Sequence, residues 1–408
     1  MKRIGSLFGA ALFLHALMAC QSSPSVAEPV GQTAQKVIGG VNSTADQDEV
    51  VLLVNFDPGS GGVGQCTGSL IAPNLVLTAR HCVAKTDEGA ACDADGNPIG
   101  NSAKVYSDKD PKTIYVFTGP KRPDFGPRTQ PNGQGARLFT SGAKTMCNND
   151  IALILLKEPI EGAKLAKLRL DSEAEKKEEV TVVGWGITDK TDSPNTRQTR
   201  EGIKIVDVGP SKNSAANEFI VGESICSGDS GGPALSSKGA ILGVVSRGGN
   251  GTGATGAGAC EGAAYNIYTK VSTFKELILE ALTEAGAEPW LEDGPDPRLA
   301  KFGAECTDGA ECRSSICNLS AGAGTCTSSC DEETPCPDGY VCDTNAQCVV
   351  KPAATSSGNG AAPGGSSSSS SSGCAQSGGG TGSSSSLGFV ALGLVAVLGG
   401  LGRRRRAS

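Results

Sequence analysis

GDSGGP at residues 228–233 is the stretch of this sequence that decides its interpretation. A serine hydroxyl is a weak nucleophile until a neighbouring base takes its proton. The glycines around Ser230 leave backbone N–H groups exposed, and such groups can hold the negative oxygen formed when a serine attacks a carbonyl. We therefore predict that Ser230 is a nucleophile and that the N–H groups of Gly228 and Ser230 form an oxyanion hole.

Two short motifs earlier in the chain supply the partners that such a serine needs. TARHC at 78–82 contains His81, and NDIAL at 149–153 contains Asp150. A histidine base works best when a buried carboxylate fixes its tautomer, so we predict that His81 is the base and that Asp150 orients it. The other histidine, His15, lies in the N-terminal targeting segment. One remaining histidine excludes a multi-histidine metal site, and we expect neither a metal nor a cofactor.

The order His, Asp, Ser and the motifs around it resemble the trypsin/chymotrypsin family of serine proteases over residues 37–290. The resemblance implies two six-stranded antiparallel β-barrels with a C-terminal helix, and serine endopeptidase activity on protein or peptide substrates. The residues alone favour an all-β barrel or sandwich, because short apolar runs recur between turn residues. Ser272 or Thr273 is the expected cap of the helix. The expected strands are residues 50–56, 75–78, 113–118, 151–156, 180–185, 203–208 and 240–246.

The same resemblance implies that the chain is activated by cleavage. KVIGG at 36–40 matches the family's activation site. Cutting after Lys36 by another protease would free the amine of Val37. In the family this amine pairs with the carboxylate that precedes the nucleophile, here Asp229, and the pair organises the oxyanion hole.

Family spacing also implies which residues form the specificity pocket. Ser224 falls at the pocket floor, Ser246 and Gly248 lie on the strand that pairs with substrate, and Asn266 stands where glycine usually keeps the pocket open. A serine floor offers no charge to Lys or Arg, and an asparagine narrows the space for an aromatic ring. We expect a preference for small or medium uncharged side chains, with a polar side chain such as Gln as the alternative.

Two arginines depart from the family pattern and leave the preference at other subsites open. Arg80 stands beside the histidine where a small residue is usual, and Arg247 stands where an aromatic residue usually forms a substrate platform. The Gly-rich insertion at 249–259 could also shift the alignment and move Asn266 out of the pocket.

Sixteen cysteines indicate an oxidising compartment. Family spacing implies the disulfide Cys66–Cys82 beside the histidine and the disulfide Cys226–Cys260 around the pocket. Cys92 and Cys147 remain and are paired by elimination.

Residues 302–350 contain eight further cysteines and predict a disulfide-rich module, in which bridges replace a hydrophobic core. Eight cysteines allow 105 connectivities, so we choose none. A zinc site is the competing interpretation, disfavoured because the module has no CxxC pair and no histidine. The acidic residues 331–333 are interpreted as a solvated loop rather than a calcium site.

Both ends of the chain predict export and attachment to a membrane. Residues 1–20 have a basic start and an apolar run that ends LMAC, which resembles a bacterial lipobox with Cys20 as the lipidated residue; ordinary signal cleavage is the alternative. Residues 351–386 are an expected disordered Ser/Gly linker. An apolar segment with an Arg-rich end follows at 387–408 and is the expected tail helix. With Cys374, this end resembles the Gly-Cys sorting tail of myxobacterial-type exported proteins, and a plain tail anchor is the alternative.

Together these patterns predict an exported serine endopeptidase at the cell envelope or surface, held by a lipid or a tail anchor. A net charge of −7 gives no reason to expect a nucleic-acid partner. The alternatives are a catalytically inactive surface binding protein on the same fold and an esterase that uses the same triad. The predicted parts are a signal peptide (1–20), a propeptide (21–36), the protease domain (37–290), the disulfide-rich module (302–350), the linker (351–386) and the apolar tail (387–408).

Overall fold

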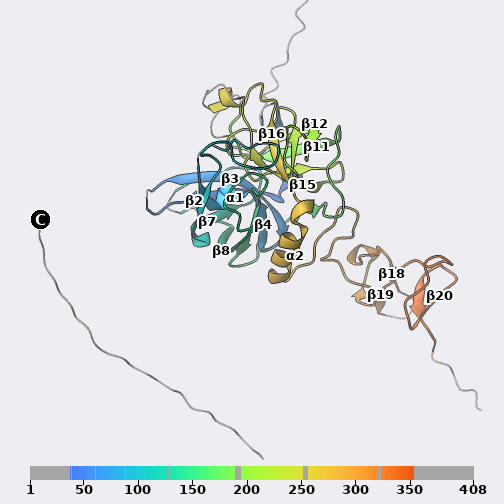
Figure 1. The fold of residues 1–408 in the computed structure, drawn as a ribbon. Coiled ribbons are helices and arrows are strands. Elements are labelled where there is room, and N and C mark those ends of the chain that lie inside the picture. The colour runs from blue at the N-terminus through green and yellow to red at the C-terminus, as the bar shows by residue number, and fades with distance from the viewer. Residues whose placement is uncertain are drawn as a thin grey trace, which may run out of the picture. The chain divides into compact units, whose positions relative to one another are not determined.

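The structure, a computed structural model, describes residues 37–352 apart from residues 38, 60, 88, 127, 189–193, 251–255 and 320–322. The predicted signal peptide, propeptide and apolar tail, with Cys20, Lys36 and Cys374, lie outside the described residues, as does nearly all of the predicted linker. Strands dominate the ribbon (Figure 1). In the part of the chain that the structure describes, no helix is long and apolar enough to cross a membrane.

Six antiparallel strands from the first half of the protease region close into a barrel in the order β2-β3-β4-β9-β8-β7. Leu and β-branched residues suit a half-buried pleated strand, and the barrel buries Leu53, Leu70, Val76 and Ile154 completely. Each such side chain contributes about 1.5–3 kcal/mol when it leaves water. The strands are β2 (Val50–Phe56), β3 (Val63–Ala72), β4 (Leu75–Thr78), β7 (Ile114–Phe117), β8 (Gly133–Thr140) and β9 (Ala152–Leu156).

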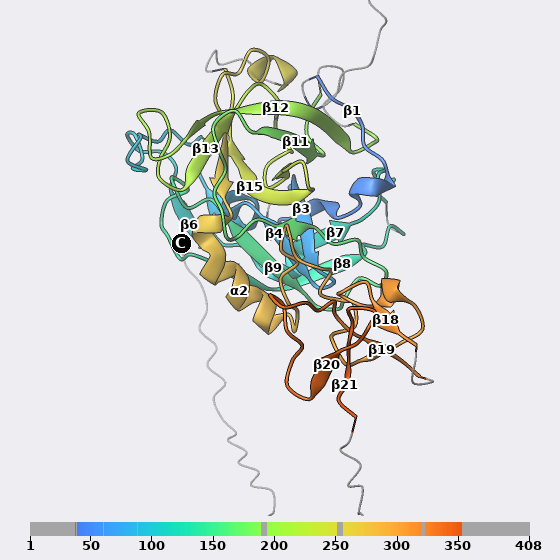
Figure 2. The same ribbon diagram turned by 90° about the vertical axis from the view of Figure 1, so that its right-hand side faces the viewer.

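A second ring of six strands follows in the order β12-β11-β14-β15-β16-β13, and pairing of β12 with β13 closes it. Figure 2 shows this group of strands separate from the first barrel. The predicted fold of two six-stranded antiparallel barrels is confirmed. The strands of this half are β1 (Val41–Asn42), β10 (Lys167–Leu168), β11 (Glu179–Gly184), β12 (Gln198–Val208), β13 (Glu218–Val221), β14 (Pro233–Leu235), β15 (Ala240–Arg247) and β16 (Asn266–Lys270).

The predicted C-terminal helix is present as α2 (Lys275–Glu284), which buries Ile278, Ala281 and Leu282. Its predicted cap is wrong. Residues Ser272–Phe274 form a 3-10 turn ahead of the helix, and the Thr273 hydroxyl donates to the Lys270 carbonyl instead of capping α2. The remaining elements of the protease region are α1 (Arg80–Val83), β5 (Ala84–Thr86), β6 (Val105–Asp108) and the 3-10 turns Ala45–Gln47, Pro111–Thr113 and Gly256–Ala259.

The C-terminal cysteine region consists of two small units, each held by two disulfides. Strands β17, β18 and β19 form one sheet, and β20 pairs with β21 in the other. Sheets of two or three residues per strand bury too little to be stable alone, so the bridges replace a core. The strands are β17 (Glu305–Cys306), β18 (Cys317–Asn318), β19 (Gly324–Cys326), β20 (Tyr340–Cys342) and β21 (Cys348–Val350). The disulfides are Cys306–Cys317, Cys312–Cys326, Cys330–Cys342 and Cys336–Cys348.

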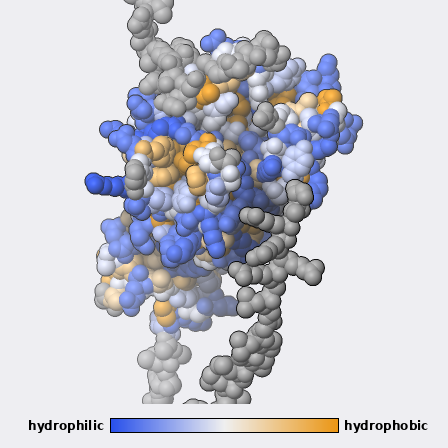
Figure 3. Space-filling view, turned by 90° about the vertical axis from the view of Figure 1, so that its left-hand side faces the viewer, coloured by the Kyte–Doolittle hydropathy of each residue, from blue (hydrophilic) through white to orange (hydrophobic). Residues whose placement is uncertain are grey.

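The face shown in Figure 3 is mainly hydrophilic, with hydrophobic residues in small patches. Scattered apolar side chains are normal on a folded surface.

Candidate active site

Two neighbouring strands of the first barrel bring His81 and Asp150 together. Thr78, the last residue of β4, pairs with Ala152, the first residue of β9. The helical turn α1 and the loop before β9 therefore meet at one end of the barrel. The Nδ1 atom of His81 lies 2.8 Å from Oδ2 of Asp150, and the His81 backbone N–H donates to Oδ1 at 2.9 Å. Two contacts thus fix the imidazole relative to the carboxylate.

The charges in this pair support each other. Burial alone works against ionised Asp150, which is 1% exposed, but His81 and the hydroxyl of Ser246, which donates to Oδ2 at 2.7 Å, hold the pKa of Asp150 below its usual value. Burial also opposes a charged His81, yet the Asp150 carboxylate raises the pKa of His81 above its usual value, with Lys109 acting in the opposite direction. The pair can therefore accept a proton on His81 while Asp150 stays ionised.

Ser230 comes from the second barrel, in the turn before β14. Its carbonyl accepts the N–H of Thr67, and the N–H of Gly231 donates to Val245 at 2.9 Å, so strands of both barrels hold this turn. Ser230, His81 and Asp150 line one cavity of about 580 Å³. Within the described residues the Ser230 hydroxyl has no hydrogen-bond partner. Catalytic hydrogen bonds of this kind often tighten only when substrate is bound.

The backbone beside the serine offers two unused donors. Among the described residues, no acceptor is bonded to the N–H groups of Gly228 and Ser230. Gly228 has a φ of +99°, and a Cβ there would lie 2.9 Å from the Cα of Gly186. Only glycine fits that position, because it alone tolerates both the conformation and the close backbone. These donors could hold an oxyanion.

Asp229 is a buried carboxyl group with no cationic partner among the residues that the structure describes. It is 2% exposed and accepts the N–H groups of Gly186 at 2.8 Å and Cys226 at 2.9 Å. Burial raises its pKa from 3.8 to about 7, against the two backbone hydrogen bonds. No ion pair to Asp229 occurs among the described residues. Val37, whose amine is still part of a peptide bond, is 1% exposed and belongs to the buried cluster that includes Ala234 of β14.

The cavity that contains Ser230 is lined by some, but not all, of the residues predicted for the specificity pocket. Neither Ser224 nor Asn266 lines the cavity, whereas Ile225, Ser246 and Gly248 do. The Ser224 hydroxyl donates to the Gly222 carbonyl at 3.0 Å. The Asn266 side chain lies beneath Gly248, since a Cβ on Gly248 would be 2.7 Å from its Oδ1 and 3.3 Å from Cδ1 of Ile225. The sequence did not identify the isoleucine, because family spacing places the pocket floor one residue earlier, at Ser224.

The residues after α1 build a further wall of the cavity that the sequence analysis missed. Lys85, Asp87 and Lys109 line it together with Ser246 and Arg247. The disulfide Cys92–Cys147 ties this segment to the loop that carries Asp150. In the sequence, the pair Cys92 and Cys147, assigned by elimination, was the feature that could have indicated this wall.

Both unexpected arginines are paired with acids. Arg80 forms an ion pair with Asp108 at 2.7 Å. Arg247 forms one with Glu218 at 2.7 Å, and neither acid was among the predicted site residues.

The other two disulfides of the protease region join the pairs that the family resemblance implies, Cys66–Cys82 and Cys226–Cys260. In the described ranges, each group of side chains close enough to share a metal ion contains disulfide-bonded cysteines. A disulfide sulfur is no longer a thiolate, which is the form that binds metals.

Two six-stranded barrels that bring a histidine–aspartate pair to a serine beside free N–H groups define a chymotrypsin-like serine protease. In a comparison with known families, residues 37–278 match Trypsin. The chain belongs to the trypsin family and is a serine endopeptidase.

Curated relatives agree with this assignment. The chain is 30% identical over 237 residues to snake venom serine protease KN9 of Trimeresurus stejnegeri, covering 54% of this chain and 79% of the relative. It is 27% identical over 244 residues to phenoloxidase-activating factor 3 of Holotrichia diomphalia, covering 52% and 65%. It is 26% identical over 256 residues to submandibular glandular kallikrein-9 of Rattus norvegicus, covering 58% and 87%. A solved structure, an inactivated protease paralogue of the scabies mite, shares 19% identity with a TM-score of 0.43, covering 62% of this chain and 99% of that one.

Proposed function

We propose that this chain cleaves peptide bonds with His81, Asp150 and Ser230 as its catalytic triad. The observation that carries the proposal is the fixed His81–Asp150 pair in the same cavity as Ser230, next to two N–H groups without acceptors. The Ser230 oxygen attacks the peptide carbonyl while His81 takes the hydroxyl proton. The N–H groups of Gly228 and Ser230 stabilise the oxyanion, and Asp150 stabilises the imidazolium.

The reaction then proceeds through an acyl-enzyme. His81 gives its proton to the departing amine as the C–N bond breaks, and water, activated by the same imidazole, releases the acyl group from Ser230. A fluorophosphonate probe tests the assignment. We expect covalent labelling of the processed protein and none of Ser230→Ala. No labelling of the processed protein would favour the inactive binding protein instead.

We infer that the chain is a precursor activated by another protease at Lys36. Asp229 supports this, because a carboxyl group buried without a cation is costly and a freed Val37 amine would supply the cation. Val37 is already buried in the hydrophobic cluster of the second barrel. N-terminal sequencing of active enzyme should give Val37 as the first residue, and any other start contradicts the inference.

We propose that the enzyme prefers small or medium uncharged side chains before the scissile bond. Ile225 lines the cavity and Asn266 lies beneath Gly248, so bulk occupies the space that an aromatic or a long side chain would need. An unpaired ammonium would be desolvated there without compensation. We test this with peptides that vary only at that residue. A preference for Lys or Arg would overturn it.

We also propose that the protein is exported and held at the cell envelope or surface. The LMAC sequence ending at Cys20 and the C-terminal segment after Cys374 motivate the two anchors. Cys20→Ala and Cys374→Ala, tested separately for release from the membrane fraction, identify the anchor in use. Retention of the double variant would contradict both cysteine-dependent anchors and favour the plain tail anchor.

A further inference from the structure

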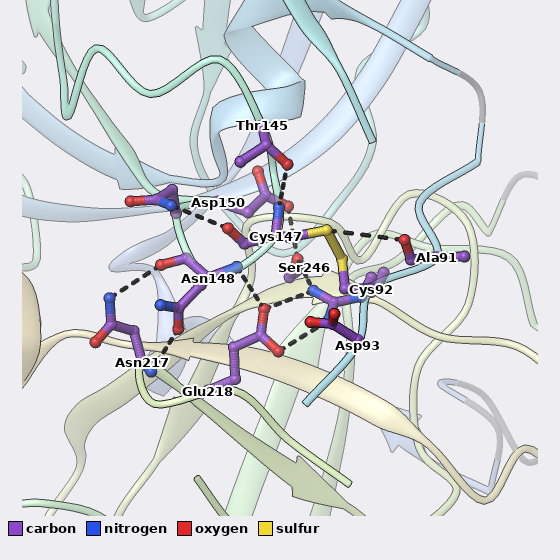
Figure 4. Close-up of polar contacts among 12 residues, drawn as sticks. Ala91, Cys92, Asp93, Thr145, Cys147, Asn148, Asp150, Asn217, Glu218 and Ser246 are labelled. Carbon is purple, nitrogen blue, oxygen red and sulfur yellow. Dashed lines mark hydrogen bonds and ion pairs between the residues drawn. A yellow bond between two sulfur atoms is a disulfide. The ribbon is translucent and has the colours of Figure 1, made fainter. Parts of the chain in front are cut away.

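A buried carboxylate at the start of β13, that of Glu218, belongs to a polar network near Asp150 of the proposed triad (Figure 4). The Glu218 side chain is 1% exposed. Its oxygens accept Nη1 and Nη2 of Arg247 at 2.7 and 2.8 Å, and Oε1 also accepts the backbone N–H of Asn148 at 2.9 Å. Bidentate pairs of this kind are strong and directional. Removing one partner leaves an uncompensated buried charge.

The first segment held by this network is the loop that carries Asp150. Asn148 has a φ of +63°, in the left-handed region. It is hydrogen-bonded to Asn217 as well as to Glu218. The Asn217 N–H donates to Oδ1 of Asn148 at 2.6 Å, and its side-chain amide donates to the Asn148 carbonyl at 3.0 Å. Thus β13 of the second barrel fixes the loop of the first barrel two residues before the catalytic carboxylate.

The second segment is the end of β15, which connects the network to Asp150 by hydrogen bonds. Nη1 of Arg247 lies 3.4 Å from the Ser246 hydroxyl, which donates to Oδ2 of Asp150 at 2.7 Å. The guanidinium is therefore only two contacts from the carboxylate that supports His81. An unpaired cation at this distance would act against a protonated imidazole.

We propose that Glu218 is a positioning residue for the proteolytic reaction: it joins the Asp150 loop to the substrate-binding strand, and it neutralises Arg247 so that the Asp150 charge acts on His81. This proposal rests on the proposed triad. Among the described residues, the charged groups that bear on His81 directly are Asp150 and Lys109. Lys109 is left unchanged in every variant, so that any difference comes from the Glu218–Arg247 pair.

The test compares the pH dependence of kcat/KM in processed, active-site-titrated enzyme for three variants. Glu218→Gln keeps the size of the side chain but leaves Arg247 without a counter-charge. We expect the acidic limb of its kcat/KM profile to move to lower pH by about half a unit, because the unpaired Arg247 disfavours protonated His81. We also expect kcat to fall about tenfold or more, because the Asp150 loop is less well fixed. In the double variant Glu218→Gln/Arg247→Gln no unpaired charge remains, so the limb should return towards its original position.

Glu292→Gln is the control for loss of a buried carboxylate elsewhere, because Glu292, 10% exposed, makes a bidentate pair with Arg169 away from the active-site cavity. Arg169 keeps its second partner, Glu178, in this variant. A limb that stays in place in Glu218→Gln, or that moves equally in Glu292→Gln, overturns the proposal. The position of the limb does not depend on how much protein is folded, so a loss of stability does not obscure it. Ser230→Ala is assayed in parallel, and only proteolysis by that variant would count against the triad itself.

Discussion

The two halves of the active site differ in how complete they are. In the first barrel, His81 and Asp150 already hold each other, and Ser246 completes the carboxylate's hydrogen bonds. In the second barrel, Ser230 has no hydroxyl partner among the described residues, and Asp229 is buried without a cation. The His81–Asp150 pair is therefore already assembled. The turn with Ser230 and Asp229 has no cation beside the Asp229 carboxyl group among the described residues. This difference supports the proposal that the chain is inactive until it is cleaved after Lys36.

The largest expected effect tests whether the two halves act as one unit. Ser230→Ala and His81→Ala should each lower kcat/KM by about 10⁴-fold or more. The double variant should be little worse than either single variant, because the residues serve the same step. Steady-state kinetics on a peptide substrate measures this. Additive losses would mean that the two halves act independently.

The next effect tests the incomplete half alone. A precursor that cannot be cut, Lys36→Gln, should be about 100-fold or more less active than processed enzyme, a loss on the scale of one oxyanion-hole donor. Lys36→Arg is the control, because a protease that cuts after basic residues should still process it. Near-normal activity of uncut Lys36→Gln would show that the second half is already complete.

The third effect concerns the stability of the uncut chain. The pKa of Asp229 rises from 3.8 to about 7 on folding, so between these pH values the folded chain keeps a proton that the unfolded chain has lost. Stability must therefore fall as pH rises through this window. Asp229→Asn should remove that slope. Its effect on stability at pH 7 combines relief of the buried charge with the loss of one acceptor, because the amide nitrogen cannot accept a backbone N–H as the second carboxylate oxygen does. Urea unfolding of the precursor at several pH values measures it, and a slope unchanged by the substitution contradicts it.

The smallest effect is a shift in the pH at which kcat/KM falls on the acidic side. It tests the half of the site formed by His81 and Asp150. Because Asp150 raises the pKa of His81, the acidic limb of kcat/KM in processed enzyme should lie above the usual histidine value of about 6.5. Below that limb the protonated imidazole cannot accept the serine proton. A limb below the usual value would mean that burial and Lys109 outweigh Asp150. The profile should be measured in low and moderate salt, since a buried pair is screened little.

Much of the fold and the chemistry follows from short stretches of sequence. The β-barrels are recoverable because each strand is a local apolar run bounded by turn residues, as in Val50–Phe56 and Leu75–Thr78. The helix was located by its apolar face, but its cap was not, since residues 272–274 form a turn of their own. The residues proposed for catalysis can be named in advance because a nucleophile, a base and free backbone N–H groups impose strict local patterns.

The surroundings of that chemistry were decided by the tertiary structure. Closure of the barrels brings Glu218 to Asn148, 70 residues earlier, and Asn266 beneath Gly248. Ile225 lines the cavity that contains Ser230, whereas Ser224, one residue earlier, does not. The sequence by itself determined which groups we propose for the chemistry, because motifs encode reactivity locally. Packing decided which side chains surround them, because contacts between residues far apart in the chain depend on the closed barrels and leave no local pattern.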